Sequence, residues 1–385
     1  MKRYLLIILL LTLSITISAQ EDNYREILDK GINAQNLKLT ELAEQYYQQA
    51  ISLEPDSAEA SLRMGLLQQA NEHYKSAKEY LNTGVTLLEN GDQPEGENLI
   101  NLATAYEHLA YCCIETLDYD NAMEMAQKAI EHNTQSASAM ASLALVYNHQ
   151  ESYTNALTWA HKAIKTDPNY ARGYNIVGII SYYRGNDTEA IKNFRKAMQI
   201  DPNDIDVYYN LGTMYCVKNN YISAINTLQK GLQKSPRSPK LDMCLGWAYR
   251  LQNDKEKAIQ CYRAVLEYDS LNVDAHNLMG SIYNERGEFK LAQACHRNSI
   301  RIAPDDPVGY RLLGKSYSDQ GNYSKALHYF QKSSALKKDG ETYCMIAEMY
   351  ARQHNSSRET ATYKKAAALG NKTAQEWLTK RGITW

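Results

Sequence analysis

The 385-residue sequence lacks the short motifs that usually mark a catalytic or metal-binding site. It contains no phosphate-binding loop and no glycine-rich dinucleotide motif after a strand, and few stretches resemble strands at all. Its nine histidines show none of the spacings that bind zinc. We therefore expect no enzyme activity, no catalytic residue, no cofactor and no metal.

Cysteine is sparse and unpatterned. The seven cysteines are scattered along the chain, and none belongs to a C-x-x-C pair. The one adjacent pair, Cys112 and Cys113, falls within a helical stretch, where a core role is more plausible than redox chemistry. Because free cysteine behaves as a small buried hydrophobe, we expect most of the seven in the core.

Long apolar runs are absent except at the N-terminus, which begins MKRYLLIILLLTLSITISAQ. A basic start, an apolar run of about 14 residues and small residues before its end are typical of a secretory signal peptide. We predict that residues 1–19 are cleaved off after Ala19 and that the chain is exported, to the periplasm or the medium. An uncleaved anchor is the alternative, although the run is shorter than the ~20 residues that span a bilayer. The mature chain has no other candidate span.

What the sequence does contain is a repeat. The stretch AIKNFRKAMQIDPND, residues 190–204, places small and apolar residues three or four apart and ends at a proline, as an amphipathic helix does. Similar stretches lie 34 residues before it, ALTWAHKAIKTDPNY, and 34 residues after it, AINTLQKGLQKSPRS. A fixed period of this length with two helical segments is typical of a stacked helical array.

These residues resemble the tetratricopeptide repeat, a helix–turn–helix unit. Ten repeats then start near residues 24, 58, 103, 137, 171, 205, 239, 273, 307 and 340. Position 8, where the two helices approach closely, is always small: Gly31, Gly65, Ala110, Ala144, Gly178, Gly212, Gly246, Gly280, Gly314 and Ala347. Position 20, which we expect across from it, is alanine in nine of the ten repeats.

The resemblance implies an all-α fold, a right-handed superhelical solenoid of about ten hairpins over residues 20–371. Residues 89–99 form an insertion that we expect to be a mobile loop, and residues 372–385 a capping helix. The C-terminal unit also resembles a Sel1-like repeat, and the leader resembles those of exported proteins of the Bacteroidota.

In this family the first helices line a concave groove, chiefly through positions 2, 5, 9, 12 and 13. Aromatic and arginine side chains are enriched where proteins bind one another. The resemblance therefore implies a binding groove in the fifth to seventh repeats, with these candidate residues: Arg172, Asn175, Tyr182, Tyr183, Tyr209, Met243, Trp247 and Arg250. Trp247 is the strongest candidate, because a groove position gives a tryptophan no evident core role.

We expect a non-catalytic scaffold of the bacterial cell envelope that binds a protein or peptide. The alternatives are a glycan-binding envelope protein and an accessory subunit of an envelope enzyme or secretion assembly. No nucleic-acid partner is expected. Acidic residues dominate before residue 137 and basic residues after it, so self-association is possible through opposite charges.

Overall fold

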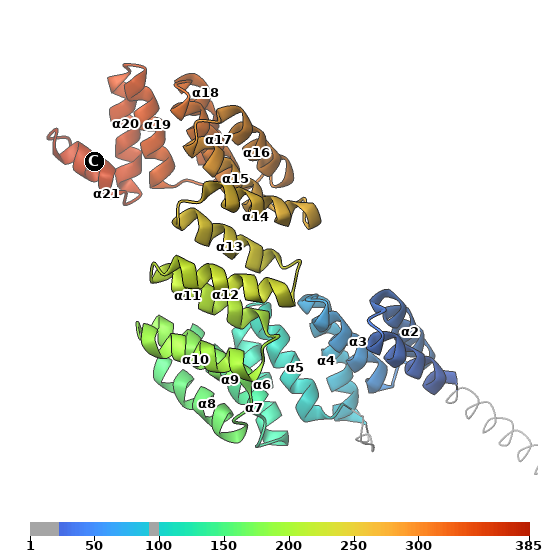
Figure 1. The fold of residues 1–385 in the computed structure, drawn as a ribbon. Helices are drawn as coiled ribbons and strands as arrows, with labels where there is room; N and C mark the ends of the chain where they lie inside the picture. Colours follow the sequence, from blue (N-terminus) through green and yellow to red (C-terminus); the bar gives the residue numbers. More distant parts are fainter. Residues whose placement is uncertain (1–22, 92–99) are drawn as a thin grey trace, which may run out of the picture. The chain divides into compact units, whose positions relative to one another are not determined.

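The computed structural model describes residues 23–91 and 100–385. The predicted signal peptide and most of the predicted insertion lie outside the described residues. All regular secondary structure in the described part of the chain is helical, which confirms the all-α prediction (Figure 1). The contacts divide the chain at Pro202 into two compact units.

The first unit is a series of helical hairpins in chain order. After a helix over residues 23–36, its helices are α2 (Thr40–Leu53), α3 (Ala58–Ala70), α4 (Tyr74–Asn90), α5 (Leu102–Glu115), α6 (Tyr119–His132), α7 (Ala137–His149), α8 (Tyr153–Thr166), α9 (Ala171–Tyr183) and α10 (Asp187–Ile200).

The second unit continues the series. Its helices are α11 (Ile205–Val217), α12 (Tyr221–Lys234), α13 (Pro239–Leu251), α14 (Lys255–Tyr268), α15 (Val273–Glu285), α16 (Phe289–Ile302), α17 (Pro307–Asp319), α18 (Tyr323–Leu336), α19 (Gly340–Arg352), α20 (Ser356–Ala368) and α21 (Lys372–Thr379). Within this unit each helix packs on the next, and α11 and α13 also pack on each other.

Every hairpin turns through one residue with a left-handed backbone, and this residue is always position 15 of its repeat. Three of the ten are glycines, for which a positive φ carries no steric cost: Gly185, Gly287 and Gly321. The other seven have side chains: Lys38, Glu72, Leu117, Glu151, Asn219, Asn253 and His354. The turn geometry is thus constant while the residue type is not.

The two helices of a hairpin meet at position 8, but the nearest side chain comes from position 24 rather than from position 20 as expected. A Cβ atom added to Gly246 would lie 2.5 Å from the ring of Tyr262, and one added to Gly178 would lie 2.5 Å from Phe194. All seven glycines at position 8 face a large side chain at position 24: Tyr47, Leu81, Phe194, Leu228, Tyr262, His296 and Phe330. The alanines of the third and fourth repeats have alanine there instead, Ala126 and Ala160, and only Ala347 is combined with a ring, Tyr363.

The start of the insertion differs from the sequence-based expectation. Helix α4 has 17 residues and continues to Asn90, so Glu89 is helical rather than part of a loop. Leu81, Val85 and Leu88 are all buried at helical spacing, and this apolar stripe extends the helix. Glu89 also accepts a hydrogen bond from the hydroxyl of Tyr106.

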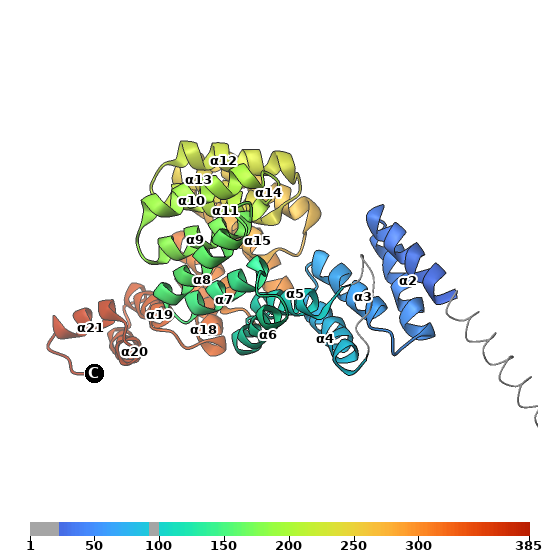
Figure 2. The ribbon, with the colours of Figure 1, turned by 90° about the horizontal axis from the view of Figure 1, so that it is seen from below.

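The chain ends in a short helix that covers the last hairpin. Helix α21 lies beside α20 (Figure 1 and Figure 2), and its Ala374 and Leu378 are fully buried. The ring of Trp377 stacks on Tyr363 with centroids 4.3 Å apart. The helix occupies residues 372–379, and residues 380–385 are not helical, so it is shorter than the expected capping helix.

Candidate functional site

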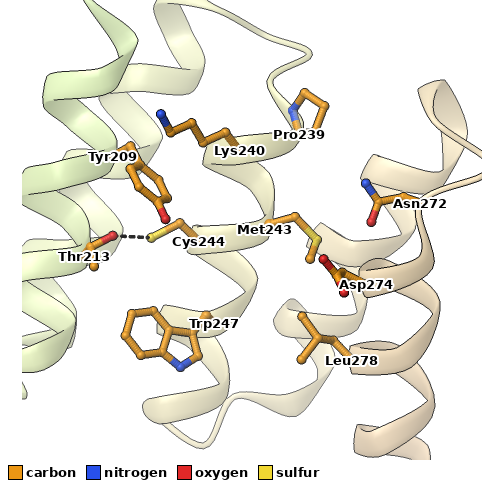
Figure 3. Close-up of a pocket in the computed structure, with 10 residues that line it drawn as sticks. All are labelled: Tyr209, Thr213, Pro239, Lys240, Met243, Cys244, Trp247, Asn272, Asp274 and Leu278. Atoms are coloured by element: carbon orange, nitrogen blue, oxygen red, sulfur yellow. Dashed lines mark hydrogen bonds between the residues drawn. The ribbon is translucent and has the colours of Figure 1, made fainter. Parts of the chain in front are cut away.

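A hollow of about 400 Å³ lies in the second unit on the side formed by the first helices of three successive repeats (Figure 3). Helix α13 supplies its centre, with α11 on one side and α15 on the other. Its lining residues are Tyr209, Thr213, Pro239, Lys240, Met243, Cys244, Trp247, Asn272, Asp274 and Leu278. Three of the predicted groove residues, Tyr209, Met243 and Trp247, are among them.

Helical spacing explains why these side chains share a face. Tyr209 and Thr213 are four residues apart on α11, and Met243 and Trp247 are four apart on α13. The start of α13 is set by Ser238, whose hydroxyl oxygen accepts a hydrogen bond from the Leu241 amide, and by proline at the first helical position.

Two aromatic rings and a thioether form part of the wall of the hollow. Tyr209, Met243 and Trp247 are each half-buried, so part of each side chain remains open to solvent. Leu278, from α15, faces Met243 across the hollow (Figure 3). Surfaces of this kind bind apolar side chains well. Aromatic rings bury a large area with few rotatable bonds, and the flexible methionine side chain adapts its shape to the ligand.

Charged groups lie at the rim. The ammonium of Lys240 lies 2.6 Å from a carboxylate oxygen of Asp206 and 4.6 Å from the centre of the Tyr209 ring. On the opposite side, the carboxylate of Asp274 is exposed and forms no ion pair within the described part of the chain. Because Lys240 is already neutralised by Asp206, the rim has an excess of negative charge.

Arg250, another predicted groove residue, forms an ion pair between neighbouring repeats. Its guanidinium pairs with the carboxylate of Glu285, and the Lys255 ammonium lies 3.1 Å from the other oxygen of the same carboxylate. Arg250 therefore links α13 to α15 and does not line the hollow.

The four remaining predicted residues belong to the first unit and line no part of this hollow. The guanidinium of Arg172 lies 4.2 Å from the centre of the Tyr111 ring, and Asn175 is buried. Tyr182 and Tyr183 are exposed, with ring centres 5.6 Å apart.

Sequence reasoning missed part of the lining. Cys244 and Leu278 both occupy position 6, which lies outside the positions that the family resemblance marks as groove-facing. Asn272 and Asp274 flank the first residue of α15, and Asn272 accepts a hydrogen bond from the Ala275 amide at 2.9 Å. Asp274 occupies position 2 of its repeat, which the resemblance does mark as groove-facing, so the repeat register could have identified it.

No group of histidine, cysteine or acidic residues in residues 23–91 and 100–385 is arranged to hold a metal ion. Among the same residues, no helix combines the length and apolar character needed to cross a bilayer.

Comparison of the sequence with family models finds tetratricopeptide repeats along the chain. Models described as tetratricopeptide repeat match residues 28–57, 114–171, 245–270 and 272–339, and one described as TPR repeat matches residues 178–215. Together these matches span more than half of the chain. A comparison with curated proteins gives no match.

Solved structures with the same fold include a tetratricopeptide repeat protein from Parabacteroides merdae, with 20% identity over 64% of this chain and 98% of that one and a TM-score of 0.51. Yeast Tom70 is similar with 16% identity over 93% and 94% of the two chains, and a TM-score of 0.52. A human IFIT1 dimer with m7Gppp-AAAA is similar with 14% identity over 88% of each chain, and a TM-score of 0.54.

At these identities the structural neighbours establish the fold and nothing further. The family models add sequence evidence for the repeat itself, and they agree with the helical hairpins and the constant turn position. The chain is therefore a tetratricopeptide repeat protein.

Proposed function

We propose that this protein is a non-catalytic scaffold that binds an extended peptide segment of a partner protein in the hollow of its second unit. Tetratricopeptide repeat proteins generally mediate protein–protein interactions and are generally non-catalytic. The observation that carries the proposal is the convergence of Tyr209, Met243 and Trp247 on one hollow, from two adjacent repeats.

The hollow favours a peptide with a large apolar side chain. Its volume of about 400 Å³ accommodates one such side chain and its neighbours, and its wall offers ring faces and a thioether. Partly open aromatic residues in a concave site are the usual anchors of protein recognition.

The test uses fluorescein-labelled peptides with one central leucine, phenylalanine or tryptophan in an otherwise polar sequence. Fluorescence anisotropy measures their affinity for the full chain and for Trp247→Ala. We expect at least one peptide to bind the wild type and to lose roughly tenfold in affinity, about 1.4 kcal/mol, with the variant. Tyr182→Ala, an exposed aromatic residue of the first unit, is the matched control and should bind as the wild type does.

Equal binding by Trp247→Ala and the wild type would place the site elsewhere. A glycan is the second candidate ligand, favoured by the exposed ring pair of Tyr182 and Tyr183. If Tyr182→Ala instead abolishes binding to an oligosaccharide array while no peptide binds, the glycan hypothesis replaces the peptide hypothesis.

The proposal also includes export of the chain to the periplasm or medium. It is supported by the basic, apolar and small-residue pattern of residues 1–19. Mass spectrometry of the protein from its own cells should find a mature N-terminus at Gln20. A full-length chain in the membrane fraction would favour the uncleaved anchor instead.

A further inference from the structure

Two cysteines from neighbouring repeats lie together beside the hollow. Cys216 belongs to α11 and Cys244 to α13, and their exposed fractions are 2% and 5%. The hydroxyl oxygen of Thr213 lies 3.4 Å from Sγ of Cys244 (Figure 3). Because Cys216 follows Thr213 by three residues on the same helix, its side chain also faces α13.

The two thiols affect each other's ionisation. Cys244 raises the pKa of Cys216, and Cys216, with the neighbouring Thr213 hydroxyl, lowers the pKa of Cys244 despite its burial. A cysteine with a lowered pKa is the better nucleophile at neutral pH.

We propose that Cys216 and Cys244 form a disulfide that joins the first helices of the sixth and seventh repeats when a small disulfide oxidant is present. The Cys244 thiolate attacks one sulfur of the oxidant, which releases one thiol and leaves a mixed disulfide at the wall of the hollow. The Cys216 thiolate then attacks Sγ of Cys244 and releases the second thiol. The two protons lost by the cysteines end on the two released thiols.

The other five cysteines provide an internal comparison. Burial raises the pKa of Cys261 to about 12, and that of Cys295 and Cys344 to about 11. Cys112 and Cys113 are adjacent on α5 and burial raises the pKa of both. None of these five combines a partner thiol on another helix with a lowered pKa.

The reaction has a route to solvent and a structural consequence. Cys244 lines the hollow, so an oxidant reaches it from there without unfolding of the repeat. The bond would hold α11 against α13, the two helices that carry Tyr209, Met243 and Trp247. The inference does not depend on what the hollow binds.

The first test is disulfide mapping of the full chain. The reduced protein is treated with oxidised glutathione, free thiols are blocked with iodoacetamide, and a tryptic digest is analysed without reduction. We expect a peptide pair linked through Cys216 and Cys244, with the other cysteines alkylated. Cys295→Ser should retain the linked pair, whereas Cys216→Ser and Cys244→Ser should each lose it.

The second test is the midpoint of thermal unfolding before and after oxidation. A disulfide constrains the unfolded chain, so the wild type and Cys295→Ser should gain a few degrees, which dithiothreitol reverses, and Cys216→Ser should not. Alkylation of both cysteines after oxidation, or a stable glutathione adduct on either, would overturn the proposal. A fall in the midpoint on oxidation would equally contradict a bond that fits the native packing.

Discussion

At position 8 of seven repeats, the absence of a Cβ atom leaves room for a ring or a leucine from the second helix of the same hairpin. Gly212 faces Leu228, and Gly314 faces Phe330, in each case with an added Cβ closer than real contacts allow. Protein interiors are packed too densely to absorb such a change without movement. The residue at position 24 therefore determines what position 8 can be.

We predict that Gly246→Val lowers the free energy of unfolding by about 3 kcal/mol, since the new side chain meets the Tyr262 ring. Urea denaturation measures the loss. In the background of Tyr262→Ala the same substitution should cost at least about 1 kcal/mol less, because the ring is gone. Additive costs in this double-mutant cycle would show that the two positions are not coupled.

His296 is the one histidine among the seven position-24 residues that face glycine. Its ring is buried against Gly280, and within the described residues its Nδ1 has no hydrogen-bond partner. Burial lowers its pKa to about 4. The native state therefore binds fewer protons than the unfolded state between about pH 4 and pH 6.5, the latter being the ordinary value for histidine.

The contribution of His296 to stability should fall as the pH falls through this window, by on the order of 3 kcal/mol in total, and level off below about pH 4. Burial also lowers the pKa of His276, which acts in the same direction. Urea midpoints measured from pH 4 to pH 7 test this. His296→Phe, which copies Phe194 and Phe330, should remove most of the slope, and an unchanged slope would contradict the assignment.

Some residue-level features follow from the sequence and others do not. The small residues at position 8 recur every 34 residues, so periodicity alone finds them. Arg250 pairs with Glu285, and Cys216 and Cys244 affect each other's ionisation, across neighbouring repeats. These pairs join unequal positions of two repeats, and an alignment of equal positions cannot identify them.

At the scale of the element, the hairpin turn imposes a left-handed residue at position 15 whatever its type. Leu117 adopts φ 60° there with 72% of its surface exposed, so its side chain gains little packing. Left-handed backbone costs a residue with a Cβ roughly 1–2 kcal/mol relative to glycine. The sequence has glycine at only three of these turns. The strained, positive φ of the other seven turn residues is therefore seen only in the backbone of the structure.

We predict that Leu117→Gly raises the free energy of unfolding by about 1 kcal/mol, because the strain is relieved and almost no contact is lost. The matched reverse change is Gly185→Leu, at a turn where nothing lies within 4 Å of an added Cβ. It should lower stability by a similar amount. Thermal unfolding of both variants measures these changes in stability. A loss of stability in Leu117→Gly would contradict the strain argument.

At the scale of the whole molecule, stability in a repeat array is a sum of repeats and their nearest-neighbour interfaces. Helix α21 contributes such an interface through the fully buried Leu378. The order and type of the elements followed from the 34-residue period, whereas the length of this last helix did not, because no following repeat constrains it.

Leu378→Ala should therefore act locally. It removes buried contacts worth about 3 kcal/mol, and we expect faster amide hydrogen exchange in α19, α20 and α21. Exchange in α11 and α12, in the same unit, should stay as in the wild type. A uniform increase across the second unit would show that the unit opens as one cooperative block.

The match between positions 8 and 24 also constrains how the array can change over time. A first helix with glycine needs a second helix with a large side chain, as in Gly178 with Phe194, while Ala110 and Ala144 are combined with alanines. Recombination within a hairpin could combine glycine at position 8 with alanine at position 24, which leaves a void. It could also combine alanine at position 8 with a ring at position 24, which crowds the ring. Duplication and shuffling of this gene should therefore preserve whole hairpins, and chimeras built from it should be joined between repeats rather than at the turns inside them.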